Sequence, residues 1–157
     1  MTAQAAGREG AVILALGSTA RILLETPRRY LSLGAIAVQV LPAIQLGQIA
    51  FCFDGRGRPV GYATWAFLTE RVAMELGVDS TRVLHVSEWD EGSILWIMDF
   101  VAPMGHAMEL ARTVRSRLPS AHLFRGARWG ADGAIRRAVS FRVKRTQERQ
   151  LSGVRVS

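Results

Sequence analysis

The sequence holds one cysteine and one lysine in 157 residues, and long hydrophobic runs are missing. Cys52 has no second cysteine with which to form an internal disulfide or a metal site, and its place in an apolar run favours burial over reactivity. The apolar run at residues 11–16 is too short to span a bilayer, and no strongly basic segment precedes it as in a signal peptide. We therefore expect a cytoplasmic protein without a membrane span.

Metal-binding and cofactor-binding motifs are also missing. The three histidines, His85, His106 and His122, have no HExxH motif and no carboxylate or thiol at the spacing that metal ligands need. No Gly-x-Ser-x-Gly, P-loop or complete Rossmann motif occurs. The sequence therefore predicts no metal and no permanently bound cofactor.

The charge is strongly positive, with 20 Lys+Arg against 13 Asp+Glu, and Lys144 is the single lysine. The guanidinium of arginine offers a planar fork of donors for carboxylates and phosphates. The partner of such a surface can be nucleic acid, an anionic membrane or an acidic protein, and a solvated basic face is an equal alternative. Nucleic acid remains a minor alternative, because the aromatic residues lie in apolar runs and are not interleaved with arginines.

Periodicity and turn residues predict one α/β (α+β) domain over residues 10–143, with a flexible segment at 1–9 and a basic, disordered tail at 144–157. The expected order is α-α-β-β-α-β-α-β-β. Helices are expected at residues 11–24, 32–44, 70–76 and 104–118, and strands at residues 48–53, 59–65, 94–101, 123–129 and 135–143.

Asp99 is the residue that most clearly indicates chemistry. It is the single charge in the apolar run at residues 94–101, and a buried carboxylate must be paired, hydrogen-bonded or functional. A structural ion pair with an arginine is the alternative.

The turn after this run, at residues 102–107, leads into a helix N-terminus, which presents free amides to a phosphate. His106 lies at this helix start, beyond the end of the strand.

Several stretches together resemble the RTX toxin-activating lysine acyltransferases, and the likeness extends over residues 11–142. Their order and spacing carry it, and they are Val40-Leu41-Pro42-Ala43-Ile44, Leu46-Gly47-Gln48, Pro59-Val60-Gly61-Tyr62-Ala63-Thr64-Trp65-Ala66, Trp89 with Gly92, Trp96-Ile97-Met98-Asp99-Phe100-Val101-Ala102-Pro103-Met104-Gly105 and Leu123-Phe124-Arg125-Gly126-Ala127-Arg128. The resemblance implies a GNAT-like fold with a mixed central sheet flanked by helices. It also implies fatty acyl transfer from acyl carrier protein, the co-substrate, to internal lysines of an RTX-type protoxin.

The resemblance also assigns roles to residues. The functional aspartate of the family falls on Asp99, and its asparagine falls on Gln39, which keeps an amide to stabilise an oxyanion. The catalytic histidine of the family falls on Arg28, and a guanidinium cannot serve as a base. Arg28 would instead hold the pantetheine phosphate or repel the ammonium form of lysine, with Gly105 in the weak phosphate turn. The base would be Asp99 or His106.

Two hypotheses therefore stand. In the first, the protein is an acyltransferase in which Asp99, Gln39 and His106 are catalytic. In the second, it is a catalytically silent relative that binds acyl carrier protein or another protein. A homodimer is a possible oligomeric state under either hypothesis.

Overall fold

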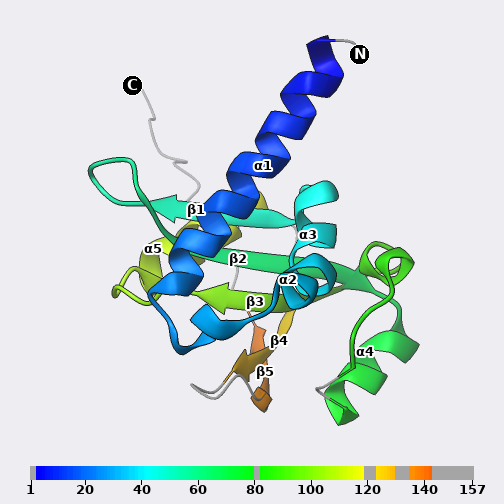
Figure 1. Ribbon diagram of the computed structural model, residues 1–157. Coiled ribbons are helices and arrows are strands. Elements are labelled where there is room, and N and C mark those ends of the chain that lie inside the picture. Colours follow the sequence, from blue (N-terminus) through cyan, green and yellow to red (C-terminus); the bar gives the residue numbers. More distant parts are fainter. Residues whose placement is uncertain (1–2, 80–81, 119–122, 130–134, 143–157) are drawn as a thin grey trace, which may run out of the picture.

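The structure, a computed structural model, describes residues 3–79, 82–118, 123–129 and 135–142, with side chains described for 6–79 and 82–118. Its centre is a five-stranded sheet in the order β1-β2-β3-β4-β5. Helices lie on both faces of this sheet (Figure 1). The predicted α+β class, with a mixed sheet in one domain, is confirmed.

The strand order follows the chain, and of the four strand pairings described one is parallel. The strands are β1 (Ile49–Phe53), β2 (Pro59–Leu68), β3 (Ile94–Val101), β4 (Leu123–Trp129) and β5 (Ile135–Arg142). β3 and β4 run parallel and all other neighbours are antiparallel. The central place of β3 agrees with its near-continuous apolar sequence, since a central strand is covered on both faces.

One face of the sheet carries the helices from the N-terminal third of the chain (Figure 1). They are α1 (Ala3–Leu24), α2 (Leu33–Gln39) and α3 (Leu41–Gln45), joined by the 3-10 turn η1 (Pro27–Tyr30). α1 packs through Ile22 and Leu23 against β2, whereas its first turns project beyond the sheet. Among the described residues, no helix has both the length and the apolar character needed to cross a bilayer.

Two helix boundaries differ from those expected. Residues 3–9, predicted to be flexible, continue α1, because Ala3, Gln4 and the alanines that follow are good helix formers although they lack apolar periodicity. The helix expected at residues 32–44 begins at the N-cap Ser32 as predicted but is interrupted at Val40. Pro42 explains the interruption, because it occupies the second position of α3, where its missing N–H costs nothing.

The opposite face of the sheet is covered by α5 (Ala107–Arg117). Leu110 and Val114 of this helix pack against Cys52, Ala63 and Trp65. α5 begins three residues later than expected because Gly105, at φ 83°, still belongs to the turn. Cys52 is buried, as predicted.

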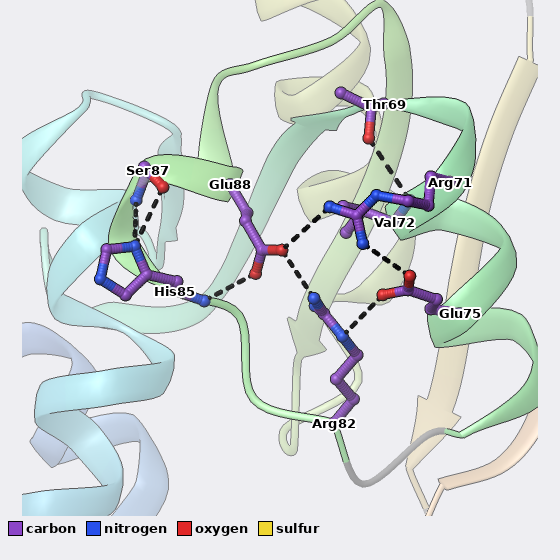
Figure 2. Close-up of polar contacts among 8 residues, drawn as sticks. All are labelled: Thr69, Arg71, Val72, Glu75, Arg82, His85, Ser87 and Glu88. Atoms are coloured by element: carbon purple, nitrogen blue, oxygen red, sulfur yellow. Dashed lines mark hydrogen bonds and ion pairs between the residues drawn. The ribbon is translucent and has the colours of Figure 1, made fainter.

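α4 (Glu70–Val78) and the 3-10 turn η2 (Val86–Trp89) lie at the end of β2 and are tied together by charges (Figure 2). Arg82 contacts Glu75 at 3.1 Å and Glu88 at 2.6 Å. Glu88 also accepts the backbone N–H of His85 at 2.9 Å, which completes a capping box. These contacts hold η2 in place, and its Trp89 is packed in the core.

Glu88→Gln is expected to weaken this connection in a pH-dependent manner. Hydrogen bonds from Arg82 and from the His85 N–H lower the pKa of Glu88. A lowered pKa contributes stability above the pKa of the unfolded chain, and this stability is lost as the pH falls through the folded value. Urea unfolding at a series of pH values should show that Glu88→Gln is less stable than wild type at neutral pH. This difference in stability should disappear in acid. Glu91→Gln, a change at an exposed neighbour, is the control. A loss of stability in Glu88→Gln that is the same at all pH values would contradict the role of the Glu88 charge.

Candidate functional site

Asp99 lies on the helix-covered face of the sheet because β3 contains a bulge. Thr64 pairs with Asp99, but the next residue of β2, Trp65, pairs with Ile97, so Met98 is the extra residue. The bulge places Asp99 on the same face as Trp96, whose side chain packs against α3, α4 and η2. Without the bulge, side chains would alternate along β3, and Asp99 and Trp96 would lie on opposite faces of the sheet.

Arg28 reaches Asp99 from η1, and Thr26 sets its direction. The Thr26 hydroxyl donates to the Leu23 carbonyl at 2.7 Å and accepts the Arg28 backbone N–H at 3.0 Å, so one side chain ends α1 and begins η1. Arg28 then turns inward, whereas Arg29 is exposed and donates to the Thr26 carbonyl. The tight turn therefore separates two adjacent arginines into an inner and an outer one.

The Arg28–Asp99 ion pair is buried and symmetric. Nη1 of Arg28 lies 2.8 Å from both carboxylate oxygens. The two side chains are only 10% and 6% exposed, so solvent screens the pair weakly. Burial by itself would lower the pKa of Arg28, but the Asp99 charge and hydrogen bonding outweigh it and the pKa is raised. Arg28 is therefore a permanent cation at this site.

Tyr62 is the third member of the site. It is completely buried on β2, and its hydroxyl donates to Oδ2 of Asp99 at 2.6 Å. Burial, followed by the charge of Asp99, raises the pKa of Tyr62, so the side chain remains a phenol. The Phe100 backbone N–H donates to Oδ1 at 3.1 Å. Each carboxylate oxygen thus accepts two hydrogen bonds.

The site joins segments that are far apart in the sequence: η1, β2 and β3. An ion pair between Asp99 and an arginine is present, and the arginine is Arg28, the residue on which the resemblance places the histidine of the family. Sequence reasoning missed Tyr62, although a buried tyrosine needs a partner for its hydroxyl, and this requirement was a usable signal.

The other predicted site residues do not contact the carboxylate. Gln39 is the half-buried last residue of α2, and the bonds that Asp99 accepts come from Arg28, Tyr62 and Phe100. His106, expected near Asp99, instead places Nδ1 3.1 Å from Oε2 of Glu109 at the start of α5. His106 is the N-cap residue of α5, but its side chain makes no capping hydrogen bond. Gly105 forms the preceding turn.

The comparisons with known proteins identify the family of the chain. Residues 10–142 match the model of the RTX toxin acyltransferase family. The chain belongs to that family. Two relatives are the lysine acyltransferase RtxC of Vibrio cholerae, 34% identical over 80 residues, and the RTX-II toxin-activating lysine acyltransferase ApxIIC of Actinobacillus pleuropneumoniae, 32% identical over 105 residues. The leukotoxin-activating lysine acyltransferase LtxC of Aggregatibacter actinomycetemcomitans is 32% identical over 114 residues.

The match covers much of this chain but only part of each relative. For RtxC it includes 51% of this chain and 52% of the relative, and for ApxIIC 66% and 64%. For LtxC it includes 72% of this chain and 66% of the relative. The predicted membership of the RTX toxin acyltransferase family is confirmed, while the activity of this member is a matter for proposal.

Proposed function

We propose that this RTX toxin acyltransferase family member transfers a fatty acyl group from acyl carrier protein to an internal lysine of a partner protein of the RTX protoxin type. The observation that carries the proposal is the buried Asp99 carboxylate, which accepts hydrogen bonds from Arg28 and Tyr62. The resemblance places the functional aspartate of the family on this residue. A carboxylate in an apolar strand is costly to bury, and such groups concentrate at functional sites.

The basic surface supports an acidic donor such as acyl carrier protein. On α5 the exposed Arg112, Arg115 and Arg117 follow the turn at Gly105. Acyl carrier protein is acidic and carries its acyl chain on a phosphopantetheine arm. Complementary charge mainly speeds and orients such an encounter.

The reaction needs attack by a lysine nitrogen on the thioester carbonyl. The lysine ammonium first loses one proton to water. The new C–N bond then forms as the C–S bond breaks, a second proton passes from the nitrogen to the departing pantetheine sulfur, which leaves as a thiol, and the third stays on the amide nitrogen. A cation near the approaching ammonium lowers the lysine pKa, and the same cation stabilises the oxyanion of the tetrahedral intermediate. We assign both effects to Arg28.

Asp99 has a different role from the base considered in the sequence analysis. Its oxygens already accept hydrogen bonds from Arg28, Tyr62 and the Phe100 amide. A carboxylate held in this way acts as a fixed counter-charge that aims the guanidinium. Gln39 and His106 remain secondary candidates for contact with the substrate.

A second candidate function is favoured by the same ion pair. By the resemblance, Arg28 stands where the family has its histidine, and its ion pair with Asp99 could serve the fold alone. In this alternative the protein binds acyl carrier protein or a protein partner without catalysis.

The test is to supply acyl carrier protein charged with a fatty acid and a lysine-bearing protoxin segment, then to detect the amide by mass spectrometry. We expect product from the charged carrier and none from uncharged carrier with free fatty acid. Carrier binding by calorimetry without any amide would instead identify the silent binder.

A further inference from the structure

The four hydrogen bonds of Asp99 divide into two kinds. Nη1 of Arg28 lies at the same 2.8 Å from both oxygens, so this nitrogen bridges the carboxylate and its place depends on where both oxygens lie. Each of the other two bonds reaches a single oxygen: the Phe100 N–H donates to Oδ1 and the Tyr62 hydroxyl donates to Oδ2. These two bonds fix the plane of the carboxylate.

The two fixing bonds differ in what holds their donors. The Phe100 N–H belongs to the residue next to Asp99 and restrains only the near oxygen. Tyr62 lies on the neighbouring strand, is completely buried and sits in the core between α1 and α3. Its ring cannot move without disturbing that core. Burial and the Asp99 charge raise the pKa of its hydroxyl, which therefore remains a donor.

We propose that Tyr62 is a positioning residue that acts through Asp99 to aim the Arg28 guanidinium at the reacting thioester. This inference rests on the proposed acyl transfer, because it assigns to Tyr62 the orientation of the cation on which that chemistry depends. Preorganised charge is effective only when it already points to where the new charge develops.

Thr64 supplies a matched control on the same strand. It is also completely buried and lies directly opposite Asp99, yet its hydroxyl has no hydrogen-bond partner among the described residues. Thr64→Val keeps the shape and removes an unused polar group, so it should raise the melting temperature and leave the acyl-transfer rate unchanged. Tyr62→Phe, by contrast, removes a hydroxyl that donates a hydrogen bond to Asp99.

Tyr62→Phe should lower kcat about tenfold and leave KM for both substrates unchanged, since one hydrogen bond to a charged group is lost. Equal kcat values for wild type and Tyr62→Phe, or a rise in KM alone, would overturn the proposal. An equal loss of kcat in Thr64→Val would also overturn it, because the effect would then come from any change to this strand.

A second measurement does not need activity. In ¹⁵N spectra of arginine side chains, a guanidinium held at Asp99 should rotate slowly and give a distinct signal, assigned by its loss in Arg28→Lys. We expect this signal to broaden in Tyr62→Phe and to persist in Thr64→Val. If wild type forms no amide, the proposed function fails, while this spectrum still decides whether Tyr62 orients Arg28. An unchanged Arg28 signal in Tyr62→Phe would refute the positioning role even in an active enzyme.

Discussion

Asp99→Asn is expected to lower the free energy of unfolding by about 3–5 kcal/mol, because it leaves the buried Arg28 cation without its counter-charge. The same change should abolish acyl transfer. Such a loss is a large share of the stability of a typical domain, about 5–15 kcal/mol. Chemical denaturation followed by tryptophan fluorescence, together with the amide assay, measures both effects.

Two further variants separate the structural effect from the chemical one. The double change Arg28→Met and Asp99→Leu removes both charges, so much of the stability should return although transfer stays absent. Arg71→Gln removes one partner of an exposed ion pair and should change stability little. Full stability of Asp99→Asn would show that the pair is not buried in solution. Full activity would show that the site lies elsewhere.

Gly92→Ala should prevent folding or cost more than about 4 kcal/mol, a loss that only severe steric or polar defects cause. A Cβ at this position would lie 2.0 Å from the Leu68 carbonyl oxygen and 2.3 Å from the Thr69 nitrogen. Both atoms belong to the backbone at the junction of β2 and α4, and therefore neither can turn aside. Urea unfolding or the yield of soluble protein measures the effect.

Gly17→Ala is the matched control for this substitution. Gly17 lies within α1, and a Cβ there would meet nothing within 4 Å. Alanine should therefore raise the stability by about 0.5–1 kcal/mol through its better helix propensity. Similar stabilities for Gly92→Ala and wild type would mean that the chain after η2 does not approach β2 as closely as the structure shows.

Much of the fold was predictable because its signals are local. β3 and β4 have the bounds expected from their apolar runs and flanking turn residues. α4 begins after the N-cap Thr69 as expected, but it continues through Gly77 to Val78. A glycine without steric neighbours does not end a helix by itself.

The site was predictable only in part, because its assembly is not local. Asp99 was identifiable as a charge within an apolar run, and its pairing with an arginine was one alternative. The partner, Arg28, is 71 residues away. The face on which Asp99 lies depends on the bulge at Met98, which periodicity does not reveal. The strand containing Tyr62 was predicted, but the orientation of its hydroxyl follows from the pairing of β2 with β3.

Parts of the earlier predictions concern residues that the structure does not describe. The basic tail at 144–157 and His122 lie outside the described residues, and so does Lys144. Side chains of the arginines in β4 and β5 are likewise not described, although the backbone of both strands is. The described residues nevertheless include exposed arginines, among them Arg112, Arg115 and Arg117 of α5.

The most direct measurement of the central claim compares amide formation by wild type, Arg28→His and Asp99→Asn under identical conditions. Each protein receives the same charged acyl carrier protein and lysine-bearing acceptor, and the product is counted by intact-mass spectrometry over time. We predict product from wild type, none from Asp99→Asn, and no requirement for histidine at position 28. No product from wild type, with clear product from Arg28→His, would contradict the claim and identify a silent member of the RTX toxin acyltransferase family.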